Sequence, residues 1–332
     1  MYNKKKAILI TGGAGFIGSH LAEKLLAQGE EVLIIDDLST GNLDNLKHLE
    51  GNQNFKFIEG SVLDKDLLVQ NIAKVDEVYH LAAAVGVKTI IDKPLESFLI
   101  NIDGTKNVLE AAAKKKIPVL IASSSEVYGK NNKLPFKEED DRVYGSAYHN
   151  RWGYGFSKGS DEFLGLAYFR EKQLPVIIVR LFNVIGPRQT GAYGMVVPRF
   201  VKQALSGQAL TIYGDGRQTR CFGYIDDVVD ALIGLMENPK SYGQIFNVGS
   251  DEEISIKDLA EKIIELTKKK LPNINPKIEF IPYAEVYGTD FEDMLRRRPD
   301  LAKIKKTINY HPKFTLEESL KKIINYCIND AR

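Results

Sequence analysis

The chain has 332 residues, of which 44% are hydrophobic and 27% are charged, and its formal net charge is +1. This length allows a sizeable core in one large or two modest domains, and the near-neutral charge argues against nucleic-acid and anionic-membrane partners. Two cysteines, Cys221 and Cys327, are too few for a disulfide framework and favour reduced thiols. The apolar run at residues 7–10 is too short for a signal peptide, and no later run approaches a membrane span. We therefore expect a cytoplasmic protein.

Short β-branched runs alternate with helical patterns through the first half. The predicted strands are residues 7–11, 31–36, 55–59, 76–82, 118–123 and 175–180, and the predicted helices are 18–29, 65–73, 95–116 and 152–172. This alternation predicts a parallel, doubly wound α/β sheet covered by helices on both faces. After residue 181 the pattern loosens into a smaller α+β lobe. The expected domains are 1–180 with about 224–248, and a substrate lobe of 181–223 and 249–332.

A glycine-rich turn follows the first strand and opens the first helix. Glycines at this rhythm permit a tight turn, close approach of a pyrophosphate to backbone N–H groups, and close helix–strand packing. The next strand ends in Asp36, which would accept hydrogen bonds from the adenosine ribose and repel a 2′-phosphate. These features predict a Rossmann-type domain that binds NAD rather than NADP. The predicted cofactor residues of the turn are Gly12, Gly15, Phe16, Ile17 and Gly18.

Two further cofactor contacts are predicted from position alone. Asp64 follows the third strand, where an acid can meet the adenine amino group. Ala82 follows the fourth strand, where a small residue leaves room for the cofactor.

A second group of polar residues predicts the chemistry. Tyr154 and Lys158 lie four residues apart, so a helix presents both on one face, and a lysine ammonium lowers the pKa of a neighbouring phenol. Tyr154 would then serve as a base near neutral pH. The fifth strand delivers a serine-rich end, in which Ser124 would hold the substrate oxygen while Tyr154 removes its proton.

The stretches TGGAGFIGSH, SSSEVYG, YGFSK, RLFNVIGPR and YGDGRQTRCFGYIDD, together with Asp36, resemble the extended short-chain dehydrogenase/reductase family. That family comprises NAD-dependent nucleotide-sugar epimerases, dehydratases and decarboxylases. The match runs from the first strand to about Val248, with a fainter echo in RRRPD. It implies that Ser124, Tyr154 and Lys158 are catalytic, and that Tyr154 and Lys158 also contact the cofactor.

The resemblance also implies substrate contacts. Asn183 would contact the substrate diphosphate, and Arg220 the nucleotide phosphates. Arg297 and Asp300 resemble a C-terminal RxxD that holds the nucleotide, although three consecutive arginines leave the register open. Alternatively, Asn183 caps a turn and residues 296–298 are a solvated charge run.

The dipeptide Ser125-Glu126 discriminates among the reactions of this family. All begin by oxidising the sugar at C4. A simple 4-epimerase has no use for the Glu126 carboxylate, and dehydratases usually carry Asp-Glu there. Ser125-Glu126 therefore fits a UDP-hexuronate decarboxylase best, a dehydratase less well and a 4-epimerase least. In a decarboxylase, Arg188 or one of the arginines 296–298 would grip the uronate carboxylate.

The remaining expectations concern partners. We expect a UDP-linked sugar as substrate, Ser125 among the substrate contacts, no metal, and a homodimer formed through helices at 95–114 and 152–172. A non-catalytic dinucleotide-sensing module is a remote alternative, because the fold also hosts such proteins.

Overall fold

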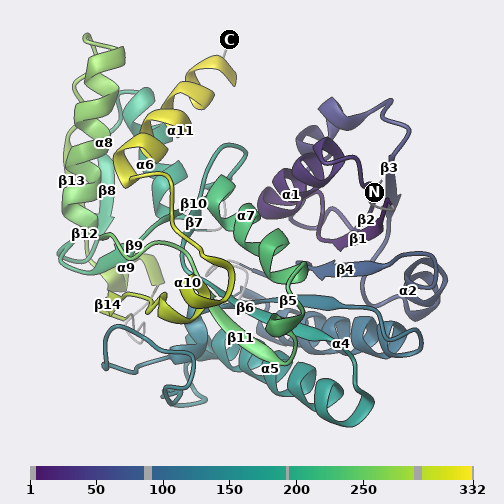
Figure 1. Ribbon diagram of the computed structural model, residues 1–332. Helices are drawn as coiled ribbons and strands as arrows, with labels where there is room; N and C mark the ends of the chain where they lie inside the picture. The colour runs from purple at the N-terminus through teal and green to yellow at the C-terminus, as the bar shows by residue number, and fades with distance from the viewer. Residues whose placement is uncertain (1–4, 86–91, 192–193, 288–293, 331–332) are drawn as a thin grey trace.

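The computed structural model describes residues 5–85, 92–191, 194–287 and 294–330. Within these ranges the main sheet has seven strands, all parallel, which confirms the expected doubly wound α/β class. In spatial order they are β11 (Gln244–Val248), β6 (Val176–Leu181), β5 (Val119–Ser124), β4 (Glu77–His80), β1 (Ala7–Thr11), β2 (Glu31–Asp36) and β3 (Phe55–Glu59). The sheet lies at the centre of Figure 1.

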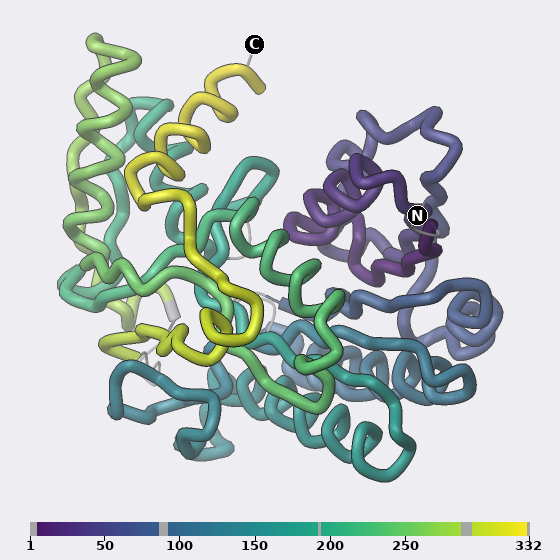
Figure 2. Tube along the Cα trace, in the orientation of Figure 1, coloured from purple at the N-terminus to yellow at the C-terminus, as the bar shows by residue number. Residues whose placement is uncertain are grey.

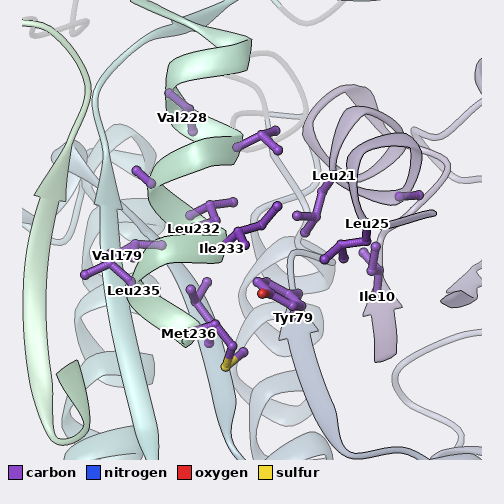
Figure 3. Close-up of a cluster of buried hydrophobic side chains, with 14 of the residues drawn as sticks. Ile10, Leu21, Leu25, Tyr79, Val179, Val228, Leu232, Ile233, Leu235 and Met236 are labelled. Atoms are coloured by element: carbon purple, nitrogen blue, oxygen red, sulfur yellow. The ribbon is translucent and has the colours of Figure 1, made fainter. Parts of the chain in front are cut away.

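Helices cover both faces of this sheet, so its strands are apolar on both sides. In β1, Ile8 and Ile10 belong to one buried cluster, whereas Leu9 belongs to the other. Helices α1 (Phe16–Ala27) and α7 (Ile225–Met236) cover the first face, where Leu21 and Leu232 pack together with Ile10 and Tyr79 (Figure 3). Helices α2 (Lys65–Ile72), α4 (Pro94–Ala113) and α5 (Gly153–Lys172) cover the second face.

A further buried cluster lies outside the main sheet, among shorter strands that pair as β7 with β10, β9 with β12 and β14, and β8 with β13. The strands are β7 (Val184–Ile185), β8 (Leu210–Tyr213), β9 (Thr219–Cys221), β10 (Gly223–Tyr224), β12 (Glu253–Ser255), β13 (Ile278–Ile281) and β14 (Arg296–Arg297). The accompanying helices are α6 (Val196–Leu205), α8 (Ile256–Lys270), α9 (Tyr283–Tyr287) and α11 (Leu316–Asp330). Figure 2 shows this part of the chain to one side of the main sheet.

The C-terminal segment connects the two cores. Helix α10 (Ala302–Ile308) places Leu301, Ile304 and Tyr310 in the cluster of the main sheet, whereas Leu320 and Ile323 of α11 belong to the smaller cluster. Part of the segment that we assigned to the substrate lobe therefore packs against the main sheet, and the domain boundaries stay a prediction. No helix in the described ranges is long and apolar enough to cross a membrane.

The strand order reverses between β1 and β4, where a parallel sheet opens a crevice at its carboxyl edge. Strands β1, β2, β4, β5 and β6 all end at this edge, so the residues that follow them are brought together although they are far apart in the sequence.

Candidate active site

A pocket of about 890 Å³ lies at the carboxyl edge of the main sheet and extends to the shorter strands. It collects most of the residues that the sequence singled out. The predicted residues that line it are Gly12, Gly15, Phe16, Ile17, Gly18, Asp36, Ala82, Ser124, Ser125, Glu126, Tyr154, Asn183, Arg220 and Arg297.

The glycine turn forms a close-packed cradle at one end of this pocket. Gly15 precedes helix α1 and has no side chain that could cap it, so the first N–H groups of the helix can bind phosphate oxygens. A Cβ added to Gly18 would lie only 2.4 Å from the Gly12 carbonyl oxygen, so only glycine allows the helix to start this close to the turn.

The Asp36 carboxylate lies beside the cradle and is fixed by two backbone N–H donors. Ala14 donates to Oδ2 over 2.9 Å, and Leu38 donates to Oδ1 over 2.8 Å. Burial raises the pKa of Asp36, and these two hydrogen bonds oppose that rise. The remaining lone pairs of a carboxylate held this way can accept from ribose hydroxyls.

Ser124 and Tyr154 meet because a strand end and a helix start are adjacent. Ser124 is the last residue of β5 and caps a 3₁₀ turn, its hydroxyl accepting from the Glu126 N–H over 3.3 Å. Tyr154 lies in the first turn of α5, where a Cβ on Gly155 would come 2.5 Å from the Glu126 carbonyl oxygen. Gly155 therefore permits this close approach.

The charge around the Tyr154 phenol differs from the sequence-based expectation. Burial raises the pKa of Tyr154 above its ordinary value, and the negative charge of Glu126 adds to the rise, whereas a hydrogen bond with Ser124 opposes it. The Lys158 ammonium pairs with Asp161 instead, with 2.8 Å between Nζ and Oδ2. The expected lowering of the pKa of Tyr154 by Lys158 is therefore not what this arrangement produces.

Glu126 is clamped between two guanidinium groups. Its Oε2 lies 2.6 Å from Arg151 Nη1, and its Oε1 lies 2.7 Å from Arg297 Nη1. Burial opposes ionisation of Glu126, but the charges of Arg151 and Arg297 outweigh it and lower its pKa to about 2. The charge of Arg220 acts in the same direction. The pocket floor therefore holds an ionised carboxylate in an excess of positive charge.

A loop that follows β5 fixes the position of Arg297. Phe136 donates its N–H to the Arg298 carbonyl over 2.9 Å and accepts from the Asp300 N–H over 2.8 Å, which holds the segment directly after Arg297. The Phe136 ring is fully buried and stacks on Tyr128, with 4.5 Å between ring centroids. The loop lies beside β14 in Figure 2. Arg297 also donates to the Ser125 hydroxyl over 3.3 Å.

Four sequence-predicted site residues lie outside the pocket lining. One is Lys158, the partner of Asp161 described above, and the other three are Asp64, Arg188 and Asp300. Asp64 caps helix α2, where it accepts from the Leu67 N–H over 3.0 Å. Arg188 pairs with Glu23 over 2.5 Å, and Asp300 accepts from the Ala302 N–H over 2.8 Å. The geometry therefore gives no support to the proposed adenine, carboxylate and nucleotide roles of these three residues.

The comparison with protein families decides the broader identity. The model of the GDP-mannose 4,6 dehydratase family matches residues 9–323. The chain belongs to this family.

Relatives and solved structures resemble the chain over nearly its whole length. A UDP-N-acetyl-alpha-D-glucosaminuronate decarboxylase of Bacillus cytotoxicus is 45% identical over 97% of this chain and 98% of the relative. A UDP-glucuronic acid decarboxylase of Danio rerio is 37% identical over 97% of this chain and 72% of the relative. The structure of a UDP-glucuronic acid 4-epimerase from Bacillus cereus, with UDP-glucuronic acid and NAD, is 32% identical with a TM-score of 0.85, covering 98% of this chain and all of that one.

These findings confirm that the chain is an NAD-dependent enzyme of the extended short-chain dehydrogenase/reductase type that acts on nucleotide sugars. The glycine cradle and Asp36 fit the pyrophosphate and ribose of NAD. In the described ranges no group of three or more His, Cys, Asp or Glu residues is arranged to hold a metal ion.

Sequence reasoning missed several pocket residues. Arg151 was overlooked although it stands three residues before Tyr154, where a short 3₁₀ turn directs it to Glu126. Arg199 and Tyr213 also line the pocket, with 3.9 Å between the guanidinium carbon and the ring centroid. Nothing in the local sequence pattern distinguishes these two from ordinary surface residues.

Proposed function

We propose that this enzyme decarboxylates a UDP-linked hexuronate by way of a 4-keto sugar. The observation that supports this most directly is the Glu126 carboxylate between Arg151 and Arg297 on the pocket floor. Guanidinium groups bind carboxylates with good geometry, and a uronate differs from a hexose by the carboxylate at C6. The decarboxylases among the relatives support the same reading.

The first half of the reaction uses residues on β5 and α5. Ser124 holds the oxygen at C4, and Tyr154 takes the proton of that hydroxyl. Lys158 lies one helical turn beyond Tyr154 and completes the group. NAD, which the glycine cradle and Asp36 would hold, would supply the hydride acceptor for oxidation at C4 and the hydride donor for its later reduction.

The second half uses the C4 ketone as an electron sink. The bond between C5 and C6 breaks, its electron pair moves into the C4 carbonyl as an enolate, and CO₂ leaves. A proton from solvent water then adds to C5, because the proton held by Tyr154 is returned to the C4 oxygen. Arg151 and Arg297 hold the substrate carboxylate before it leaves as CO₂. Because ionised Glu126 also pairs with these two arginines, it limits how firmly they bind the substrate carboxylate. When C4 is reduced again, Tyr154 returns its proton to the oxygen.

Dehydration fits this site less well. A dehydratase needs a base for the C5 proton and an acid for the departing hydroxyl. A carboxylate whose pKa is lowered to about 2 is a weak base, and its neighbour Ser125 is not an acid. Epimerisation at C4 remains the alternative, because epimerase structures closely resemble this chain.

A substrate panel tests the proposal. The purified protein is incubated with UDP-N-acetylglucosaminuronate, UDP-glucuronate and the two corresponding hexoses, and products are followed by NMR and by CO₂ release. We expect CO₂ and a UDP-pentose from a uronate and no change in the hexoses. The 45% identity to the Bacillus cytotoxicus relative places the N-acetylated uronate first in the panel. Interconversion of C4 epimers without CO₂ would overturn the proposal in favour of the alternative.

We further propose that the protein forms a homodimer through α4 and α5. These adjacent helices expose Leu95, Leu99, Phe156 and Phe163, with exposed fractions of 46% to 71%. Spacings of four and seven residues place each pair on one helix face. Large apolar side chains exposed together on two adjacent helices are typical of an association surface. The cytoplasmic location stays a prediction from the sequence.

A further inference from the structure

A buried ion pair lies directly behind the phenol in helix α5. Lys158 Nζ and Asp161 Oδ2 are 2.8 Å apart, and the two side chains are 2% and 0% exposed. The pair is separated by three residues, so both side chains lie on one helix face. Burying two charges is costly unless they are paired, and removing one partner leaves the other uncompensated. The reaction steps above do not use Asp161.

A chain of buried hydroxyl and imidazole groups leads to this pair from the main sheet. Thr11 Oγ1 is 2.8 Å from His80 Nδ1, and His80 Nε2 is 3.1 Å from Thr105 Oγ1. Burial lowers the pKa of His80 to about 3, so its imidazole is neutral and has one donor and one acceptor. The Thr105 hydroxyl donates its one proton to the Asp161 carboxylate, so it accepts from His80 Nε2–H. His80 Nδ1 in turn accepts from the Thr11 hydroxyl.

The hydrogen bonds from Thr11 through His80 and Thr105 therefore all donate in one direction. His80 Nε2–H donates to Thr105, and the Thr105 hydroxyl in turn lowers the pKa of the Asp161 carboxyl, against the rise that burial causes. In this series of hydrogen bonds every donor points toward Asp161, which favours the ionised form of its carboxyl group.

The charges that face the Tyr154 phenol include Glu126 and Asp161, which are negative, and Arg297, which is positive. Lys158 also faces His80 on the side of β4. We propose that Asp161 is a positioning residue: it holds the Lys158 ammonium in a fixed direction and offsets part of its charge at Tyr154.

This offset suits a reaction in which one tyrosine both takes and returns a proton. A lysine without a counter-charge would stabilise the phenolate strongly, and a strongly stabilised phenolate is a poor proton acceptor that also has no proton to return. An ion pair behind the phenol reduces this bias. The inference rests on the proposed role of Tyr154 and is independent of which sugar is bound.

The test is a direct titration of Tyr154 in the NAD-loaded protein. The tyrosinate absorbance of the protein is compared with that of its Tyr154→Phe variant over pH, and the same difference is measured in an Asp161→Asn background. Asp161→Asn removes one negative charge at nearly constant volume. We expect the apparent pKa of Tyr154 to fall by about one unit. The acid limb of the kcat profile should move to lower pH by a similar amount, and Asp161→Glu should restore both.

An unchanged Tyr154 titration in Asp161→Asn, with only a lower melting temperature, would overturn the inference because a merely structural residue behaves this way. If Asp161→Asn does not fold, the Asp161→Ser variant is measured in the same way and judged by the same criteria. Failure of both variants to fold also overturns the inference. Failure of the proposed role of Tyr154 is recognised separately, because Tyr154→Phe would then retain turnover, and failure of the proposed decarboxylation is recognised by the absence of CO₂ release.

Discussion

In the proposed mechanism Glu126 decides the reaction, because its ionised carboxylate balances two arginines that would otherwise hold a uronate firmly. Glu126→Gln leaves Ser124, Tyr154 and Lys158 unchanged, so oxidation at C4 should proceed. Gln keeps the size of Glu but carries no charge, so the arginines should retain the substrate carboxylate. We expect CO₂ release to slow by at least about a hundredfold, with reduced nicotinamide and a 4-keto uronate accumulating.

Absorbance of the reduced nicotinamide in a single-turnover mixture, together with NMR of the sugar, measures this outcome. The matched control is Glu139→Gln, which changes an exposed glutamate of the neighbouring loop and should behave like the unmodified protein. Unimpaired CO₂ release by Glu126→Gln would contradict the role given to this residue.

At the same scale, we expect Asp36 to govern the choice between NAD and NADP. Its carboxylate is oriented by the N–H groups of Ala14 and Leu38, so it presents negative charge where a 2′-phosphate would lie. We expect the protein to bind NAD well ahead of NADP, and Asp36→Asn to reduce that preference at least about tenfold. Calorimetric titration with both cofactors measures it, with Asp37→Asn as the control. A native preference for NADP would refute the assignment.

At the scale of elements, α4 and α5 each have two apolar faces. Their inner faces cover the main sheet, and their outer faces expose apolar side chains. Phe163 is 70% exposed and lies near Arg142, whose guanidinium carbon is 4.9 Å from the ring centroid. Phe163→Lys places a second positive charge there and should convert the proposed dimer into a monomer at micromolar concentration. Light scattering after size exclusion measures this.

Phe280→Lys provides the matched control for the dimer surface. Phe280 is 50% exposed and lies on β13, among the shorter strands, so this substitution should leave the dimer intact. A monomeric unmodified protein would remove the proposal outright.

At the scale of the whole molecule, the buried His80 predicts how the free energy of unfolding depends on pH. Burial and the charge of Lys158 lower the pKa of His80 to about 3, compared with 6.5 for an ordinary histidine. Between these values the unfolded chain binds a proton that the folded protein does not. The free energy of unfolding should therefore be largest above pH 6.5 and fall as the pH is lowered, by up to about 1.4 kcal/mol per pH unit for this group.

Denaturant unfolding at pH 7 and pH 5 measures this slope. His80→Gln removes the proton-binding group in both states and should reduce the slope, even if it lowers stability at both pH values. The imidazole resonances of His80 should show no titration between pH 7 and pH 4. A normal titration of this ring in the folded protein would contradict the prediction.

The sequence by itself determined the features that depend on residues close together along the chain. The alternation of strands and helices gave the doubly wound sheet, because burial on both faces requires continuous apolar strands and amphipathic helices. The glycine turn, Asp36 and the Tyr154–Lys158 spacing could be recognised as candidate site residues for the same reason, since each pattern lies within a few consecutive residues, and their roles stay predictions.

Only the tertiary structure decided how the charges in the pocket are paired. Glu126 meets Arg297, which is distant along the chain and reaches the pocket because the Phe136 loop holds its strand. Lys158 pairs with Asp161 and Arg188 with Glu23, whereas the sequence pattern predicts Lys158 beside the Tyr154 phenol and Arg188 on the substrate carboxylate. The physical reason is that ion pairing depends on distance and burial in three dimensions, and a local pattern of residue types specifies neither.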